Sequence, residues 1–286
     1  MKNILTLSVF GALLLTACGS NLRPMSQNEK DRFKTVMGSI GKSATALSSL
    51  GKTGPSNNVM QGLRSLAGSA KSEKDAREMS DRLVQAVNRG ECSYMNNIPA
   101  DFTSGKITSL KDAKFTLNGP RCPVDIELTM TVSGSPTDSS ADFRLKYESR
   151  DAEYTELADI DRLDLTGTFK LKMVTPTETS ARFEMDFEMI LSGKAHSQSE
   201  GEFKPYLRAR MGAHGDTTNP QGLNGSGEFV FGLEMKDFTG EIKAVQELRN
   251  DPNAKPKFYL NGEELTQEQL TEWLSETPFP TSSSNN

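Results

Sequence analysis

The chain has 286 residues, of which 33 are Lys or Arg and 38 are Asp or Glu, so its formal net charge is −5. This acidic balance argues against a nucleic-acid binder, which needs clustered basic side chains facing phosphates. Two histidines and three cysteines leave little material for a zinc site or a His-based triad. A content of 35% hydrophobic and 25% charged residues fits a soluble globular body rather than a membrane bundle.

The first twenty residues, MKNILTLSVFGALLLTACGS, have the pattern of a targeting segment. Lys2 gives a positive start, and the apolar stretch over 4–15 is too short for a comfortable membrane span. The run Leu15-Thr16-Ala17-Cys18 resembles the lipobox of bacterial lipoproteins, in which signal peptidase II cuts before the cysteine. An ordinary secretory signal with an incidental cysteine is the alternative.

The lipobox resemblance implies that 1–17 is a lipoprotein signal peptide and that Cys18 becomes the mature N-terminus. Cys18 would carry a diacylglyceryl thioether and usually an N-acyl chain such as palmitate, which together make a stable membrane anchor. Gly19, rather than an aspartate, follows the cysteine, and this is compatible with the outer membrane of the bacterial envelope. Removal of Lys2 changes the net charge to 32 − 38 = −6, so we expect the acyl chains and not a basic patch to hold the protein on the membrane.

Residues 18–25 form a short tether that spans roughly 25 Å when extended. The helical segment follows over 26–90. Ser26 and Glu29 make a capping box that starts a helix over 26–50, a weaker helix is predicted over 59–70, and a third begins at Ser72 and stops at Gly90. Each predicted helix is amphipathic and needs a partner surface for its apolar stripe.

The hydrophobic period then changes to two, which predicts an antiparallel β-sheet region over 91–260. Apolar residues alternate with polar ones in six strands at 124–132, 143–147, 163–173, 183–191, 203–211 and 229–235. Shorter candidates at 115–117, 238–244 and 257–260 bring the total to about nine. No strand–helix–strand pattern occurs, which excludes a parallel α/β sheet. A C-terminal helix is assigned to 261–280, signalled at Thr266, and 281–286 is expected to be a disordered tail.

The resulting fold class is α+β, with N-terminal amphipathic helices packed on a curved, half-barrel-like antiparallel sheet and a short C-terminal helix. This arrangement would cover the apolar sheet face and the helix stripes at once; a sheet curling into a barrel is the alternative. At the level of fold alone it resembles bacterial envelope lipid carriers of the lipoprotein-localisation class, with no shared motif. Cys92 and Cys122 are expected to form a disulfide, since export places them in an oxidising compartment; free thiols or a bond to another protein are the alternatives.

The apolar sheet face is rich in methionine and phenylalanine, which suit an adaptable pocket for acyl chains. The candidate ligand-binding residues are Met130, Phe169, Met173, Phe183, Met185, Phe187, Met189, Met211, Phe229, Phe231 and Met235. A filled core made of the same side chains is the alternative, because periodicity does not distinguish a filled concavity from a hollow one.

Other candidate sites give weaker signals. His196 and His214 are expected at exposed strand ends, pointing to opposite ends of one hairpin. The acidic cluster over 148–164 is expected to be a solvated loop, because it lacks the EF-hand pattern; calcium binding is the alternative. No catalytic residue, metal or cofactor is assigned, and an enzyme would need a carboxylate-only site. The sequence thus favours a non-enzymatic, membrane-anchored lipoprotein that binds a lipid or an envelope protein; a structural or interaction lipoprotein acting through loops 148–164 or 212–227 is the alternative.

Overall fold

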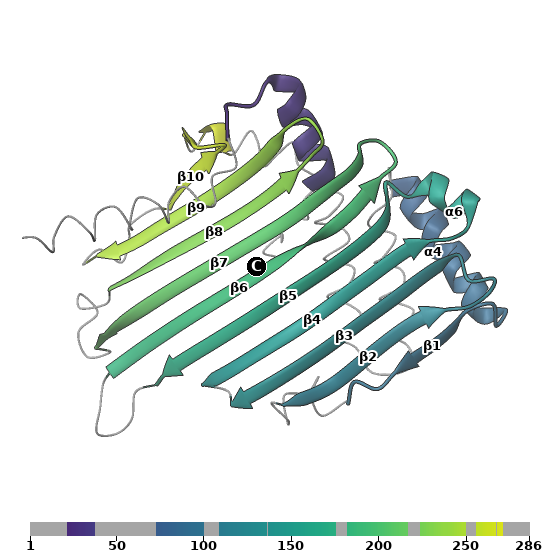
Figure 1. The fold of residues 1–286 in the computed structure, drawn as a ribbon, viewed down its shortest axis with the longest axis horizontal. Coiled ribbons are helices and arrows are strands. Elements are labelled where there is room, and N and C mark those ends of the chain that lie inside the picture. Colours follow the sequence, from purple (N-terminus) through teal and green to yellow (C-terminus); the bar gives the residue numbers. More distant parts are fainter. Residues whose placement is uncertain are drawn as a thin grey trace, which may run out of the picture.

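The computed structural model describes residues 22–37, 73–99, 109–135, 137–175, 182–216, 224–249, 256–266 and 268–270. The predicted signal peptide, Cys18, the helix over 59–70 and the C-terminal tail lie outside these ranges. Within them the chain forms one antiparallel sheet of 11 strands in sequence order (Figure 1). The strands are β1 (Ser93–Asn96), β2 (Leu110–Asn118), β3 (Val124–Ser135), β4 (Asp138–Ser149), β5 (Ile160–Val174), β6 (Arg182–Ser197), β7 (Gly201–Asp216), β8 (Asn224–Glu234), β9 (Thr239–Arg249), β10 (Lys257–Leu260) and β11 (Glu263–Leu265).

The predicted antiparallel sheet is confirmed, with two strands more than the nine expected. Each of the nine predicted strands overlaps one of β2 to β10, and two of them, 229–235 and 238–244, extend one residue beyond β8 and β9. Alternation along the longer strands separates an apolar from a polar face. The additional strands, β1 and β11, are only four and three residues long and show no alternation to detect. In the described ranges β1 and β11 are the two edges of an open sheet.

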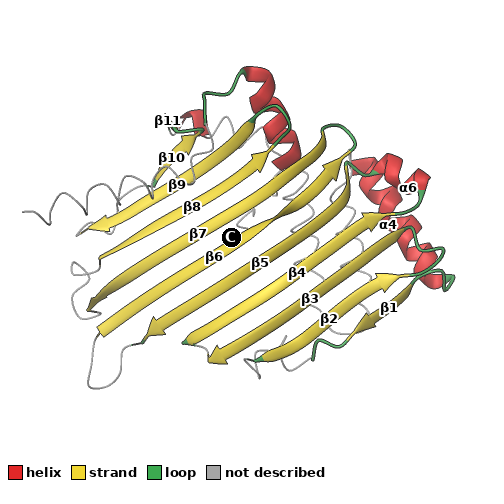
Figure 2. Ribbon diagram, viewed as in Figure 1, coloured by secondary structure: helices red, strands yellow, loops and turns green. Residues whose placement is uncertain are grey.

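Consecutive antiparallel pairing places alternate turns at opposite ends of the strands. The connections β2–β3, β4–β5, β6–β7, β8–β9 and β10–β11 share one end, which we call the capped end; the other connections share the open end. Figure 2 shows that the described helices gather at the capped end. The sheet therefore has two unlike ends, and this difference positions the candidate site.

A helix over 27–37, purple in Figure 1, begins at the predicted capping box. Glu29 Oε2 accepts from the Ser26 backbone N–H at 2.8 Å, and the Glu29 N–H donates to Ser26 Oγ at 3.4 Å. Phe33, Val36 and Met37 on this helix are buried. The Phe33 ring lies directly over Gly240 of β9, where an added Cβ would come within 2.3 Å of it. The helix therefore packs on the sheet where a glycine leaves room for its aromatic ring.

Helix α4 (Glu73–Asn88) covers another part of the capped end. Its residues Met79, Leu83 and Ala86 are buried. The chain then turns at Gly90, whose φ of 72° favours glycine, and the Glu91 N–H bonds the Ala86 carbonyl oxygen. The predicted stop at Gly90 is thus confirmed.

The hydrophobic core joins these helices to one face of the sheet at the capped end. It combines Phe33, Val36, Met79 and Leu83 of the helices with sheet and loop residues that include Leu117, Val124, Ile126, Leu145, Tyr147, Leu163, Leu165, Ala195, Phe203, Leu233 and Met235. The core also contains the disulfide Cys92–Cys122, which joins the residue before β1 to the turn before β3. The expected disulfide is therefore present.

Two expectations about connections are wrong. The acidic segment over 148–164 is not a plain solvated loop: it contains helix α6 (Ala152–Leu157), whose N-terminal N–H groups are capped by Asp151, and it buries Asp159. Nor does a helix occupy all of 261–280, because Asn261 and Gly262, with φ of 47° and 84°, make a hairpin turn into β11. The described helical residues of that segment are 268–270, after the predicted signal at Thr266.

Candidate functional site

All eleven predicted ligand-binding residues lie on the same face of the sheet as the core. Direct pairing aligns Met130, Phe143, Gly167, Leu191, Leu207 and Phe231 in one row across β3 to β8. The next row toward the open end contains Phe169, Met189 and Phe229, and the row after it contains Phe187 and Met211. Met173 pairs with Met185 beyond them. The period-two pattern therefore assigned the face correctly.

Burial along this face falls from the capped end to the open end. Met235 is only 7% exposed and belongs to the core, and Phe231 packs against it. Toward the open end Phe229 is 42% exposed and Met211 is 48% exposed. We use the name open half-face for eight residues outside the core cluster: Phe169, Met173, Phe183, Met185, Phe187, Met189, Met211 and Phe229. Phe231 and Met235 therefore serve the core, Met130 lies in the same row as Phe231 but outside the core cluster, and the open half-face is the candidate site.

The open half-face is apolar, with two uncharged polar residues in the rows that cross it. The described row through Phe169 continues with Ala141, Ala209 and Ala244, and the row through Phe187 continues with Ser139, Leu171, Gly227 and Gln246, so neither row carries a charge. Phe169 and Phe187 pack edge to face, with ring centroids 5.4 Å apart. Flexible methionines beside aromatic edges form a surface that adapts to long apolar groups.

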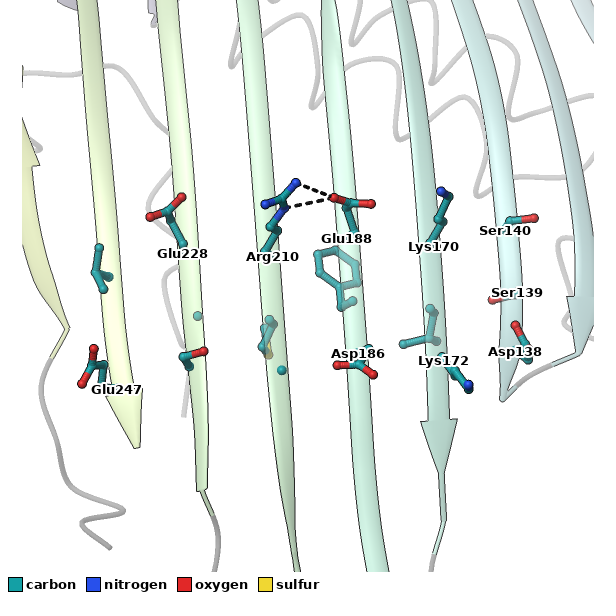
Figure 3. A pocket seen from close by; sticks show the side chains of 17 residues that line it. Asp138, Ser139, Ser140, Lys170, Lys172, Asp186, Glu188, Arg210, Glu228 and Glu247 are labelled. Atoms are coloured by element: carbon teal, nitrogen blue, oxygen red, sulfur yellow. Dashed lines mark hydrogen bonds and ion pairs between the residues drawn. The ribbon is translucent and has the colours of Figure 1, made fainter. Parts of the chain in front are cut away.

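The opposite face carries a ladder of charges that the sequence reading did not single out. Figure 3 shows Lys170, Glu188, Arg210 and Glu228 side by side along a shallow pocket on strands β5 to β8. Arg210 donates to Glu188 Oε1 from Nε at 3.0 Å and from Nη2 at 2.9 Å. Each such exposed pair contributes about 0–1 kcal/mol, so this ladder is a solvated sheet surface rather than a site for chemistry. The signal for it was present in the alternating charges of the four strands.

Nearer the capped end, two interactions on the charged face shift ionisation. The Arg144 guanidinium donates to Asp164 and lowers the pKa of that carboxyl. The Tyr206 ring covers Gly232 and its hydroxyl donates to Glu241 at 2.8 Å. Burial, with the nearby Glu241 carboxylate, raises the pKa of Tyr206 well above its usual value, so the phenol stays a neutral donor. The first interaction joins the neighbouring strands β4 and β5, and the second joins β7 to β9 across Gly232 of β8.

The two histidines do lie toward opposite ends of the β6–β7 hairpin, but only His214 is exposed. His196, expected to be exposed, has a side chain only 33% exposed, and its Nδ1 lies 2.7 Å from Asp161 Oδ1. The reason is the antiparallel pairing of β5 with β6, which places the start of β5 beside the end of β6. Across the described residues, no group of three or more His, Cys, Asp or Glu side chains could hold a metal ion.

The acidic residues of the 148–164 segment are used within the fold. Asp151 accepts from the Tyr154 N–H at 2.8 Å, and buried Asp159 accepts from the Ser197 and Ser199 hydroxyls at 3.0 and 2.7 Å. Of the other candidate loop, 212–227, the residues 217–223 lie outside the described ranges. The described chain thus gives Asp151 and Asp159 of the first loop an internal role, and it leaves Met211 and Phe229 of the open half-face exposed.

Among the described helices, none has both the length and the apolar character needed to cross a membrane. No protein-family model matches the chain, and the comparisons with curated proteins and with solved structures give no match.

Proposed function

We propose that this chain is an acyl-anchored lipoprotein of the bacterial envelope, held in the outer membrane through Cys18, and that its open half-face binds the acyl chains of a lipid. The role is binding and not catalysis. In this proposal the sheet curves around its ligand as a half-barrel, and the N-terminal helices form one wall of the site.

The observation that carries the proposal is the exposure of large apolar side chains on one half of one face. Met211 and Phe229 are 48% and 42% exposed on the same face whose other half is a packed core. Contiguous exposed apolar surface on a soluble body marks a site for an apolar partner. The other six residues of the open half-face are half-buried, so their remaining apolar area adds to the binding surface at roughly 25 cal/mol per Å² buried.

The described rows that cross the open half-face present no charged side chain, which limits what this surface can bind. The described rows of the open half-face contain hydrocarbon, thioether and aromatic groups, with Ser139 and Gln246 at their margins. An apolar chain satisfies these side chains, whereas a charged or strongly polar ligand would lose hydration without a partner. We therefore assign the acyl part of a lipid to this face.

The test uses a matched pair of variants on the two faces. Met211 and Ile190 are both exposed large apolar residues, on neighbouring strands β7 and β6, but they belong to opposite faces of the sheet. Met211→Lys should weaken binding of a fluorescent fatty acid at least tenfold, because a charge would lie among acyl-binding groups. Ile190→Lys should change it less than twofold.

A chain that binds no fluorescent fatty acid, or equal effects of the two substitutions, would contradict the lipid-binding role. In that case the rival role, an interaction lipoprotein with a filled core that acts through surface loops, would be favoured. Thermal unfolding of both variants serves as the control, since two exposed substitutions should shift stability similarly.

A further inference from the structure

The predicted tether is attached to the folded body at Arg23, which lies at the capped end of the sheet. We call Arg23 the root of the tether. Asn261, at the β10–β11 turn, donates from Nδ2 to the Arg23 carbonyl oxygen at 2.9 Å and to the Thr239 carbonyl oxygen at 2.8 Å. Its Oδ1 accepts from the Glu241 N–H at 2.6 Å, and the residue is only 6% exposed. A buried amide with three such bonds fixes residue 23 against the end of the sheet.

The residues that follow strengthen this attachment. Met25 is 6% exposed and Glu29 is 9% exposed, and Arg23 forms an ion pair with Glu29. Arg32 then donates to Glu200 in the β6–β7 turn and to Asp237 in the β8–β9 turn, both at 2.6 Å. The segment from Arg23 to Arg32 is thus bound to three of the turns at the capped end.

The length of chain between this root and the anchor is short. Arg23 lies five positions after Cys18, and five steps at ~3.5 Å each reach about 18 Å. Strands β6 and β7 have 16 residues each and run about 50 Å at ~3.3 Å per residue. An anchor on Cys18 can therefore reach the bilayer from the capped end, while the open end lies far beyond the reach of the tether.

From this geometry we infer that the turns at the capped end, 198–200, 235–238 and 261–262, form the surface that faces the lipid bilayer. The open half-face then projects away from the membrane that holds the protein. This inference depends on the lipidation of Cys18 in the proposed function, and it adds the orientation of the site. The acyl ligand would be exchanged with a partner beyond the membrane surface rather than directly with the anchoring bilayer.

An orientation in which the sheet lies flat on the bilayer is disfavoured, whichever of its two faces meets the membrane. On the apolar side, helix 27–37 and α4 stand on the sheet at the capped end. Their thickness, about 10 Å, would lift the open half-face off a flat surface. On the other side the bilayer would meet the ladder of Lys170, Glu188 and Arg210, and these charges would lose hydration.

The experiment uses the lipidated chain, purified from membranes and reconstituted in phosphatidylcholine vesicles that contain a spin-labelled lipid as quencher. With Cys18 acylated and Cys92 bonded to Cys122, one introduced cysteine is the single free thiol for a fluorophore. The label positions are exposed residues at the two ends, introduced one at a time: Lys236→Cys and Glu263→Cys at the capped end, and Asp138→Cys and Lys172→Cys at the open end.

We expect at least threefold stronger quenching at the capped end than at the open end. A further chain with twenty Gly and Ser residues inserted after Gly19 should lose most of the quenching at Lys236→Cys, because the root is no longer held near the bilayer. Equal quenching at both ends, stronger quenching at the open end, or none at either end would overturn the inference.

These results separate the inference from the proposed function. A chain that does not float with the vesicles would refute the acyl anchor itself and the inference with it. A chain that floats and shows the expected gradient, but binds no fluorescent fatty acid, would keep the orientation and refute the lipid-binding role.

Discussion

Asn261 and Arg23 are 238 positions apart in the sequence, yet the Asn261 amide donates to the Arg23 carbonyl oxygen at 2.9 Å and joins the last hairpin to the first described residues. Asn261 has a φ of 47°, a left-handed conformation that asparagine and glycine tolerate best. The same residue therefore makes the turn and holds the chain that leads to the predicted anchor.

Asn261→Gly should preserve the turn but remove all three side-chain hydrogen bonds. Because the partner groups are part-buried, we expect the free energy of unfolding to fall by about 2–4 kcal/mol. Urea unfolding followed by circular dichroism measures this loss. Asn118→Gly, at an exposed strand end, controls for glycine flexibility and should cost less than about 1 kcal/mol. Equal losses in the two variants would show that Asn261 acts only through its backbone.

Gly240→Ala tests the packing of helix 27–37 on the sheet. The added methyl group would lie 2.3 Å from the Phe33 ring, so the helix must shift, and we expect a loss of about 1–3 kcal/mol. Gly227→Ala, on neighbouring strand β8 and the same face, is the matched control, since its nearest atom is 4.0 Å away. Thermal unfolding should show a lower melting temperature for Gly240→Ala alone; a similar drop in the control would contradict the packing.

Acid should destabilise the fold through carboxylates that are bonded in the native state. Hydrogen bonds from Arg23 and from Ser26 lower the pKa of Glu29 to about 2, and hydrogen bonds from Arg144 and Arg32 lower the pKa of Asp164 and of Asp237. A lowered native pKa gives stability that is present above the unfolded value, near 4.5, and lost as the pH falls toward the native value.

The free energy of unfolding should therefore decrease between about pH 4.5 and 2, and less steeply in Arg23→Gln, in which Glu29 keeps only its Ser26 partners. Urea unfolding at a series of pH values provides the measurement. Lys236→Gln removes an exposed charge and serves as the control for net charge. A pH dependence of Arg23→Gln as steep as that of the wild type would exclude this origin.

Removing the disulfide should cost more stability than any single surface substitution. Cys92 and Cys122 are 30 residues apart, and closing such a loop contributes about 3–4 kcal/mol in the chain-entropy model. The double variant Cys92→Ser/Cys122→Ser should lose that amount in urea unfolding, and the reducing agent dithiothreitol should lower the stability of the wild type alone. An unchanged wild type under full reduction would argue that the bond contributes nothing.

The sequence predicted the apolar face well because that property is local. Alternation from Val124 to Met235 defines strands β3 to β8, and the Ser26 and Glu29 pair marks the start of the first helix. The alternation could not predict how burial changes along the face. Met211 and Met235 both follow the period-two pattern, but Met211 is 48% exposed and Met235 is 7% exposed. The pairing of His196 with Asp161 likewise depends on strand neighbours that periodicity does not identify.

The short elements escaped prediction for a related reason. Helix α6 has six residues and is stabilised by the Asp151 cap and by the burial of Tyr154, and β11 has three residues that pair only with β10. Segments this short have weak propensity signals of their own, so tertiary contacts decide their conformation.

Photocrosslinking tests the central claim most directly. The chain carrying Cys18→Ser, exported behind a cleavable secretory signal, is incubated with a fatty acid bearing a terminal diazirine, irradiated, digested and sequenced by mass spectrometry. The account predicts crosslinks on the open half-face, at residues such as Phe187, Met211 and Phe229, competed by unlabelled palmitate. Crosslinks spread over the charged face, around Lys170 and Arg210, or no competition by palmitate, would contradict it.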